Sequence, residues 1–463
     1  MTKPYSKIFE LKFFSHLILI LLSFGILTIP LVTGFNNYTL GRGWDLPKVN
    51  LLMQLLVLLS FLILVQKTYL ISINRLNFSR AKKILLPIVL LTYLFIVTIN
   101  SSWTRNLDPD TELNSIYKFL FHNILGKTEL IEVNQSLVGN AFRETGFVFY
   151  FILLVSLFLI SSYINKDTIK YIFLAFITSS ILQSFIGLNQ FYRLYQNDPE
   201  NIFLGERVYG SFGQANFFAG HIFIGFFISA FLLTNYKQRS KLKNIILSIS
   251  TSLILLTLIL SFSIWIYVIM VLSLLFILIY KYFDKKYYRK VLALFFILLA
   301  ILAVPLGSLF VKYNSEYEHR VTIWEDVIRV YIQNPIDGKD DIKLMLFGSG
   351  FDTMGEEFRE WNKIPGNYTD RSHNIIFDTI AFTGIFGLVV LASGLIYIFL
   401  RRSSFNSEHQ YLLFTLFFLL LARNLVHTYS AVNLFELFLF GIILLNSGLY
   451  TTKDLQSDKE IAA

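Results

Sequence analysis

NIILSISTSLILLTLILSFSIWIYVIMVLSLLFILIY, residues 244–280, contains 37 residues and not one charged side chain. A helix of about 20 apolar residues spans the hydrocarbon core of a bilayer, so one helix cannot take up this whole run. Two serines interrupt the run near its middle, at Ser261 and Ser263. We therefore expect two transmembrane helices, 244–261 and 263–280, joined by a tight hairpin.

The composition of the whole chain also indicates a membrane protein. Of its 463 residues 55% are hydrophobic and 15% charged, and the mean hydropathy is +0.59, whereas soluble domains carry roughly 25% charged residues. A soluble chain of this length could not bury so much apolar surface. Cysteine is absent, which excludes disulfides, thiolate metal ligands and a cysteine nucleophile. We predict an all-α polytopic membrane protein.

Other apolar runs are also long enough to cross the membrane, and about twelve spans are expected in all. The first follows Lys3, Lys7 and Lys12 as a signal peptide would, but it is too long and lacks a small-residue cleavage site. We therefore expect it to be a span. The twelve expected spans are 13–33, 49–66, 84–100, 145–163, 169–190, 214–234, 244–261, 263–280, 291–311, 375–399, 410–426 and 431–448.

The distribution of charge indicates how these spans are oriented. With both termini in the cytoplasm, every short inner segment is basic, and the acidic residues concentrate in the outer segments 101–144 and 312–374. The positive-inside rule therefore favours this topology. Orientation accounts for the net charge of +9, so nucleic acid is not expected as a partner.

The two long outer segments divide the chain into three parts. Residues 1–311 hold the first nine spans and the outer loop 101–144, residues 312–374 form a large and partly helical outer loop, and residues 375–463 hold the last three spans and a cytoplasmic tail. Long structured loops on a rigid scaffold often carry function. A cap that only stabilises the bundle is the alternative.

The larger outer loop contains YEHRVTIWEDVIRVYIQN, residues 317–334, whose apolar residues recur at helical spacing. This pattern predicts an amphipathic helix that ends at Asn334-Pro335. Arg320 stands four residues before Trp324 and therefore lies on the apolar side of the helix. An arginine there either extends to the lipid headgroups or binds an anion in a cleft.

A second candidate segment is GERVYGSFGQANFFAGH, residues 205–221, which leads into the sixth span. A glycine-rich turn before a helix presents free backbone N–H groups to an anion. Arg207 adds a fixed positive charge, and Gln214 and Asn216 add neutral hydrogen-bonding groups. An ordinary turn with a capping asparagine is the alternative.

A third candidate segment is RSHNIIFD, residues 371–378, at the start of the tenth span. Either Ser372 or Asn374 can cap that helix. His373 then lies at the positive helix end, which favours a neutral imidazole, and a neutral histidine near arginines can act as a general base or as a hydrogen-bond donor. Asp378 is a carboxylate inside the membrane boundary, where such groups are usually paired or functional. A purely structural histidine is the alternative.

Further titratable groups flank the outer ends of other spans. Arg143 precedes the fourth span, Arg423 and His427 lie at the end of the eleventh, and Glu436 lies within the twelfth, where it is a candidate partner for Arg423. Each of them is alternatively an interfacial anchor.

Motifs for other kinds of site are missing from the sequence. It contains no HExxH motif, no GxSxG and no Walker loop, which leaves arginines, His373 and amides as the candidate groups. Arginine suits phosphate because its planar fork binds two oxygens and stays charged. We therefore predict an outer-face cleft for a di-anion such as a lipid pyrophosphate.

Four places resemble the O-antigen ligase and O-antigen polymerase family of polytopic bacterial enzymes. They are similar to the family's arginine–glycine–asparagine segment, to the start of its large periplasmic loop, to its histidine–asparagine motif and to a segment of some members. In this chain they are RVYGSFGQANFFAGHI (207–222), HRVTIW (319–324) followed by Asn334-Pro335 and FGSGF (347–351), SHNIIFDTIAFTGIFG (372–387) and SLVGNAFRETG (136–146). One position departs, because SFSIW at 261–265 has Ile264 where many members carry an arginine. Either one anion ligand is missing, or Arg143 or Arg423 replaces it.

The resemblance implies a GT-C-like, metal-independent glycosyltransferase of the bacterial inner membrane that needs no cofactor and whose active site faces the periplasm. It would transfer a glycan from undecaprenyl diphosphate, with inversion, to a hydroxyl of lipid A core, of another glycan repeat or of a protein. Arg207 and Arg320 would hold the donor pyrophosphate, and His373 would activate or orient the acceptor hydroxyl. The residues expected to contact the substrates are Arg143, Gln214, Asn216, Trp324, Asn374, Asp378, Arg423 and His427.

Two other functions are open. A twelve-span transporter or lipid-linked-glycan flippase would show internal repeats of about six spans and polar groups at mid-membrane. The sequence shows no such repeat, and its polar groups collect at the outer face. A catalytically inactive relative that only binds the lipid donor is the second, and Ile264 is the residue that favours it.

Overall fold

The structure of the protein is a computed structural model that describes most of the chain. The described residues are 4–32, 46–72, 82–107, 115–126, 131–140, 143–164, 166–197, 207–235, 240–282, 294, 315–362, 371–400, 408–425 and 430–447.

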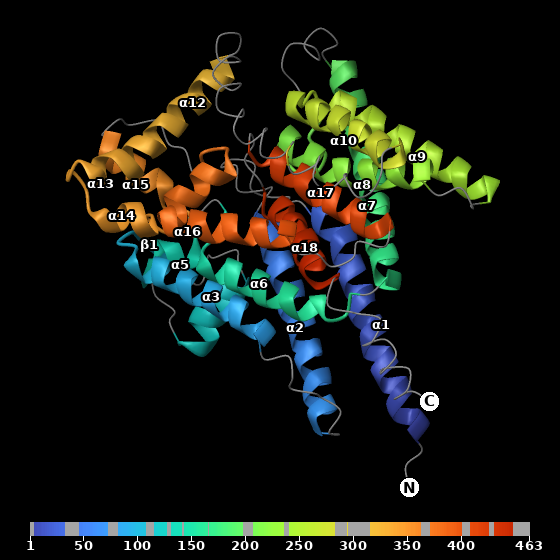
Figure 1. Ribbon diagram of the computed structural model, residues 1–463, viewed down its shortest axis with the longest axis horizontal. Helices are drawn as coiled ribbons and strands as arrows, with labels where there is room; N and C mark the ends of the chain where they lie inside the picture. The colour runs from blue at the N-terminus through green and yellow to red at the C-terminus, as the bar shows by residue number, and fades with distance from the viewer. Residues whose placement is uncertain are drawn as a thin grey trace.

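A bundle of long helices makes up most of the described chain (Figure 1). Eleven of the expected spans overlap a helix, and the remaining one, 291–311, lies outside the described residues apart from Leu294. Seven helices, α1, α2, α7, α8, α9, α10 and α16, are long and apolar enough to cross a membrane. A polytopic membrane bundle is thus supported, and the total of twelve spans stays a prediction. The helices are α1 (Pro4–Thr28), α2 (Leu46–Ser72), α3 (Lys82–Asn100), α6 (Phe147–Ser161), α7 (Lys166–Asn197), α8 (Ala215–Asn235), α9 (Lys241–Leu260), α10 (Ile264–Tyr282), α16 (Ile375–Leu400), α17 (Glu408–Arg423) and α18 (Ala431–Ser447).

The apolar run at 244–280 forms the predicted pair of helices, α9 and α10. The turn between them places Phe262 at a positive φ of 46°. The Ser261 hydroxyl donates to the carbonyl oxygen of Leu258 at 2.7 Å, so this serine satisfies a backbone group at the end of α9. Both helices pack against α8.

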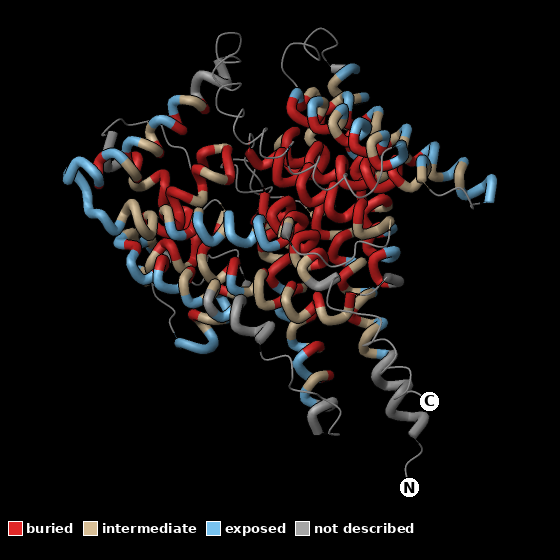
Figure 2. Tube along the Cα trace, in the orientation of Figure 1, coloured by how far each residue is buried: buried red, intermediate tan, exposed pale blue. Residues whose placement is uncertain are grey.

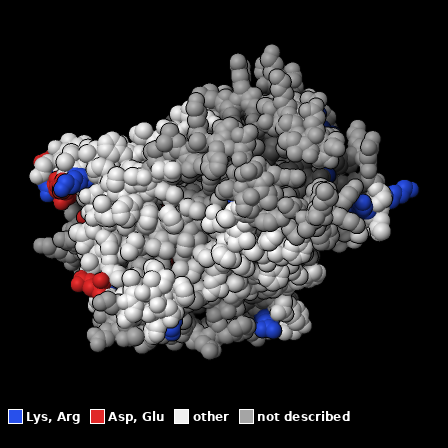
Figure 3. Space-filling view, turned by 90° about the horizontal axis from the view of Figure 1, so that it is seen from below, with Lys and Arg blue, Asp and Glu red and all other residues white. Residues whose placement is uncertain are grey.

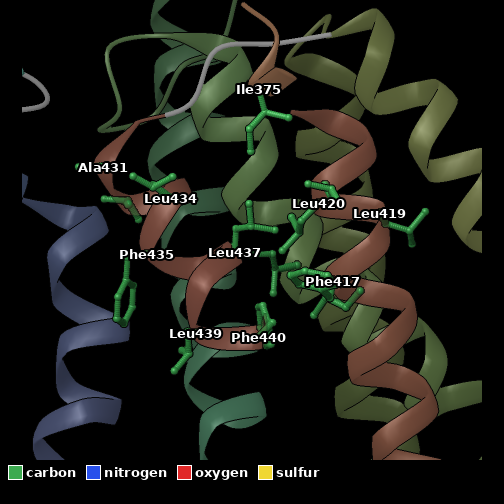
Figure 4. Close-up of a cluster of buried hydrophobic side chains, with 14 of the residues drawn as sticks. Ile375, Phe417, Leu419, Leu420, Ala431, Leu434, Phe435, Leu437, Leu439 and Phe440 are labelled. Atoms are coloured by element: carbon green, nitrogen blue, oxygen red, sulfur yellow. The ribbon is translucent and has the colours of Figure 1, made fainter. Parts of the chain in front are cut away.

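Helix α8 lies at the centre of the bundle. Every residue from Ala215 to Phe231 is buried, and α17 is buried from Tyr411 to Arg423. Figure 2 shows the buried residues gathered in the middle of the molecule, and Figure 4 shows apolar side chains filling the space around α17 and α18. Lipid tails are as apolar as these side chains, so close packing rather than escape from water holds such helices together.

Helix α9 is far less enclosed. Leu242, Ile245, Ile246 and Ile249 on its outer side are all exposed, as suits a surface in contact with lipid tails. On the face seen in Figure 3, the described Lys, Arg, Asp and Glu side chains lie toward the edges. Charged side chains are costly within the hydrocarbon region, which accounts for this distribution.

The two long outer segments pack together in one layer. Trp103 Nε1 donates to Glu357 Oε2 at 2.9 Å, and the Phe351 N–H donates to Ser136 Oγ at 2.8 Å. The short elements of this layer are β1 (Thr104–Leu107), α4 (Ser115–Lys118), η3 (Phe119–Ile124), β2 (Ile131–Asn134), α5 (Gln135–Val138), α12 (Ser315–Ile328), η5 (Arg329–Gln333), α13 (Asn334–Ile336), α14 (Ile342–Phe347) and α15 (Met354–Asn362).

Two features of this layer add to the sequence-based expectations. The described chain is mostly helical, as predicted, and it also contains one short antiparallel strand pair, β1 and β2, within 101–144, with Thr104 opposite Asn134. The amphipathic helix predicted at 317–334 is formed by α12, η5 and α13, but it ends at Ile336 and not at Asn334-Pro335. Proline is tolerated there because it stands in the first turn of α13, where its missing N–H is not needed.

Candidate functional site

Several helix ends that the charge pattern placed on the outer side meet at one end of the bundle. The Ser263 hydroxyl, before α10, donates to Asn216 Oδ1 at the start of α8 at 2.8 Å. The Ile375 N–H, at the start of α16, donates to the carbonyl oxygen of Asn424 after α17 at 2.7 Å. Lys48, near the start of α2, donates to the Ser211 carbonyl oxygen at 2.7 Å. We call this region, defined by these contacts, the site end.

The segment before α8 is held from α7. Gln190 Oε1 accepts the N–H groups of Tyr209 and Gly210, both at 3.0 Å. Gln183 Nε2 donates to Ser211 Oγ at 2.7 Å. These contacts order the glycine-rich turn that the sequence singled out, so its backbone is preorganised.

Arg207 and Gln214 lie at the two ends of this turn, and both are partly exposed. Arg207 is close enough to Tyr267 in α10 for its charge to act on the tyrosine hydroxyl. Gln214 Oε1 accepts no hydrogen bond from the described residues. Asn216, by contrast, is buried and bonded to Ser263. The turn therefore presents one cation and one amide, while its asparagine is part of the framework.

The segment at 371–378 is a tight turn with one side chain left accessible. Asn374 Oδ1 accepts the Ile376 N–H at 2.9 Å and so caps α16. Asp378 Oδ1 accepts the N–H and the hydroxyl of Ser372, at 2.6 and 2.7 Å. His373 is partly exposed between buried neighbours and has a φ of 60°, a left-handed conformation that histidine adopts more readily than most residues.

Helix α12 fixes this turn from the outer layer. Trp324 Nε1 donates to the Ser372 carbonyl oxygen at 2.8 Å, and its ring stacks on Phe377 with centroids 5.6 Å apart. Arg320, one turn earlier, is 5% exposed. The structure therefore places Arg320 in the interior, and not extended over the surface as an interfacial anchor would be.

Arg143 reaches the start of α8 from the other outer loop. Its guanidinium lies over the Phe217 ring, 5.8 Å from the centroid, and the residue is partly exposed. Such a cation–π contact orients the guanidinium. A second partly exposed cation is thus present at the site end.

Arg423 is the most enclosed of the predicted site residues. It is 1% exposed, and its Nη2 donates to the Asn216 carbonyl oxygen at 2.9 Å and to Asn433 Oδ1 at 3.2 Å. The suggested ion pair of Arg423 with Glu436 is not formed among the described residues, because the Asn433 amide lies between them and donates to Glu436 Oε2 at 3.1 Å. His427 lies outside the described residues.

The structure also brings in residues that the sequence analysis did not assign. Arg371 Nη2 donates to Asp352 Oδ1 and to Thr145 Oγ1, the latter at 2.8 Å, and its guanidinium lies 4.5 Å from the Phe382 ring centroid. In the sequence, Arg371 stands at the start of the segment that contains His373, and this position could have indicated that it belongs to the site. Buried Lys48 carried no such signal, because its partner lies 163 residues away in the sequence.

The glycine motif FGSGF, residues 347–351, packs on a kink of α16. Gly384 has a φ of 66° within the helix, which leaves carbonyl groups before the kink available. Ser349 N–H donates to the Ala381 oxygen at 2.9 Å. The hydroxyl of Tyr331 lies 2.9 Å from Ser349 Oγ, and burial raises the pKa of Tyr331 well above its usual range, so the phenol stays neutral. The motif thus joins the amphipathic helix to α16.

Taken together, the predicted residues form two groups at the site end. Partly exposed side chains offer two cations, an amide and an imidazole, which suits binding of an anion next to a proton acceptor. The other predicted side chains are buried, and most of them hold the turns that carry these groups. The partly exposed group is Arg143, Arg207, Gln214 and His373, and the buried group is Asn216, Arg320, Trp324, Asn374, Asp378 and Arg423.

Comparison with known proteins places part of the chain in a family. No curated protein matches the chain. Residues 246–392 match the family model described as O-antigen ligase. This range runs from α9 to α16 and includes Arg320, the FGSGF motif and His373, while Arg143, Arg207 and Arg423 lie outside it. Over residues 246–392 this membrane protein is therefore similar to the O-antigen ligase family.

Proposed function

We propose that the protein is a membrane glycosyltransferase that transfers a glycan from undecaprenyl diphosphate to an acceptor hydroxyl. The family match supports glycan transfer of the ligase type. The observation that carries the proposal is His373, a partly exposed imidazole on a rigid turn at the N-terminus of α16. A helix N-terminus disfavours the imidazolium and so favours a neutral ring that can accept a proton.

In the proposed reaction, the acceptor hydroxyl attacks the anomeric carbon of the donor while His373 takes its proton. The bond from the anomeric carbon to the diphosphate oxygen breaks with inversion, and undecaprenyl diphosphate leaves with the bonding electrons. Arg207 and Arg320 stabilise the charge that develops on the diphosphate. We propose a metal-independent reaction, because diphosphate is already a good leaving group when its charge is neutralised.

The other residues have supporting roles in this proposal. Arg143 and Gln214 bind polar groups of the donor from the rim of the site. Asn216, Asn374, Asp378 and Trp324 hold the two turns at the starts of α8 and α16, as their buried hydrogen bonds favour. His427 is proposed as a substrate contact from its position in the sequence.

The missing arginine of the α9–α10 hairpin does not leave that region without a cation. Ile264 opens α10 and is 52% exposed, and the hairpin is bonded through Ser263 to Asn216, in the segment that leads from Arg207 into α8. This proximity supports Arg207 as the residue that supplies positive charge beside the hairpin. It favours an active enzyme over an inactive relative that only binds the donor.

We propose that the enzyme lies in the bacterial inner membrane as a multi-pass protein. Both termini are cytoplasmic and the site end faces the periplasm, as the basic inner segments favour. The acceptor is a hydroxyl of lipid A core, of another glycan repeat or of a protein.

The direct test is transfer by the purified protein in liposomes that contain undecaprenyl-diphosphate-linked glycan and each acceptor class in turn. We expect a glycan conjugate with one acceptor and release of undecaprenyl diphosphate. In cells that lack the gene, the lipid-linked glycan should build up on the periplasmic side. Build-up confined to the inner leaflet would support a flippase instead, and no transfer to any acceptor would refute the proposal.

A further inference from the structure

We propose that Glu436, acting through Asn433, is the buried counter-ion that positions Arg423, and that Arg423 in turn holds the starts of α8 and α16 together. Glu436 and His221 are then positioning residues for the site end. The expected effect on glycan transfer rests on the proposed function. The expected effect on thermal stability does not.

A continuous chain of polar contacts carries the inference. Ser179 Oγ in α7 lies 2.9 Å from His221 Nε2 in α8. His221 Nδ1 lies 2.5 Å from Glu436 Oε1 in α18. Asn433 Nδ2 donates to Glu436 Oε2, and Asn433 Oδ1 accepts from Arg423 Nη2 in α17. One hydrogen-bonded path therefore crosses four helices at the centre of the bundle.

The buried charges in this chain balance when His221 is neutral. Ser179 and His221 are fully buried, and Glu436 and Arg423 are 1% exposed, so a net charge among them would be costly. A neutral His221 with its proton on Nδ1 donates to the Glu436 carboxylate and accepts from the Ser179 hydroxyl. Glu436 then carries one negative charge, which balances the positive charge of Arg423 across the Asn433 amide.

Arg423 joins the two site turns. Its Nη2 donates to the Asn216 carbonyl oxygen in the first turn of α8. Its Nη1 donates to Asn424 Oδ1 at 3.2 Å, and the backbone oxygen of the same asparagine accepts the Ile375 N–H at the start of α16. A shift of this guanidinium would therefore move both turns, and with them Gln214 and His373.

The same geometry could be mistaken for a nucleophilic triad. A serine, a histidine and a carboxylate in series form the catalytic centre of many hydrolases. Here the Ser179 hydroxyl is fully buried under apolar side chains of the bundle, so no substrate carbonyl can reach it. The arrangement suits a role in positioning and not in covalent catalysis.

A thermal double-mutant cycle in detergent tests the counter-ion without any activity assay. Glu436→Gln leaves Arg423 buried without its balancing charge and should lower Tm by about 10 °C. Arg423→Met combined with Glu436→Gln removes both charges and should restore much of that loss. If Glu436→Gln does not accumulate folded, recovery of folded protein in the double variant replaces the Tm comparison. A double variant as unstable as the sum of the two single changes would overturn the inference.

Transfer kinetics then separate positioning from stability. The double variant should keep a kcat reduced about 10-fold or more even though its Tm recovers, because the contacts of Arg423 to both turns are gone. Ser156→Ala is the matched control, since it removes a buried hydrogen bond between α6 and α2 and should lower Tm with kcat unchanged. Full kcat in the double variant would show that Arg423 positions nothing. If the wild type transfers no glycan, only the proposed function is refuted. The thermal double-mutant cycle still tests whether Glu436 is the counter-ion of Arg423.

Discussion

Two buried arginines lie on either side of the turn that carries His373, and their positive charges are balanced in different ways. Arg371, in the outer layer, meets the carboxylate of Asp352 directly and lies on the ring of Phe382. Arg423, in the bundle, meets amides and a backbone carbonyl, and its nearest carboxylate in the network is one side chain further away. Both are about 1% exposed.

The difference follows from where each arginine lies in the fold. Arg371 joins two loops, whose irregular backbone lets Asp352 adopt a positive φ of 56° and approach it closely. Arg423 lies among helices, whose side chains project at fixed spacing, so an intermediate amide spans the gap to Glu436. His373 stands two residues after Arg371, and Ile375 bonds to the residue after Arg423. The turn that carries His373 is thus held on one side through Arg371 and on the other through the residue that follows Arg423.

The largest effect is expected at the imidazole that both arginines hold in place. His373→Asn should lower kcat about 10²–10⁴-fold, because it removes the proton acceptor. Asparagine also adopts a positive φ readily, so Tm should change little. Steady-state transfer assays and thermal unfolding of the same preparation check this. Substantial transfer by His373→Asn would mean that another group takes the proton.

Arg320→Ala should reduce transfer nearly as much if this residue holds the diphosphate, through the loss of charge stabilisation in the transition state. The variant should still insert normally into the membrane. Arg329→Ala, on the exposed side of the same helix, is the matched control and should keep full activity. Equal activity of the two variants would remove Arg320 from the proposed site.

A large loss of stability is expected when the ion pair between Arg371 and Asp352 in the outer layer is broken. Asp352→Asn leaves Arg371 buried without its carboxylate and should cost about 3–5 kcal/mol in the free energy of unfolding. Asp337→Asn disrupts an exposed pair with Lys339 at 3.4 Å and should cost less than about 1 kcal/mol. Denaturant unfolding in detergent compares the two. Similar small losses would show that the direct pair is no stronger than a surface contact.

How far the sequence predicts these features depends on how local they are. The α9–α10 hairpin follows from the length of one apolar run, and the amphipathic helix follows from the spacing around Trp324. The cap at Asn374 follows from its position before a long apolar helix. These features depend on neighbours within a few residues, and the structure confirms the hairpin, the helix and the cap.

The contacts that hold the site depend on distant partners. His221 meets Glu436 across 215 residues, and Arg371 meets Thr145 across 226, so no periodicity in a single chain reveals them. The β1–β2 pair was missed because each strand has only four residues. The sequence thus indicated which segments carry the polar groups, but not which side chains are buried as supports and which stay accessible.

A smaller effect is expected from a substitution of Gly220, which lies against Arg423 in the bundle. A Cβ on Gly220 would lie 2.4 Å from Arg423 Cζ, so Gly220→Ala should displace the guanidinium and cost about 1–3 kcal/mol, with a loss of transfer. Gly394→Ala in α16 is the control, because a Cβ there meets nothing within 4 Å. Thermal unfolding and kcat measure both. An active and stable Gly220→Ala variant would show that the position of Arg423 is not critical.

The smallest effect is expected where neither arginine reaches, at the α9–α10 hairpin. Ile264 is 52% exposed, so Ile264→Arg should fold with a change in stability within about 0.5 kcal/mol. If Arg207 already supplies the charge beside the hairpin, a second guanidinium adds only a partly solvated contact, and KM for the lipid-linked donor should fall about threefold at most. Ile264→Gln controls for the loss of the apolar side chain. In the background of Arg207→Ala, however, Ile264→Arg should restore part of the lost transfer, because a cation then returns to the same region. No rescue in that double variant would mean that the hairpin does not border the donor site, and that the charge of Arg207 acts elsewhere.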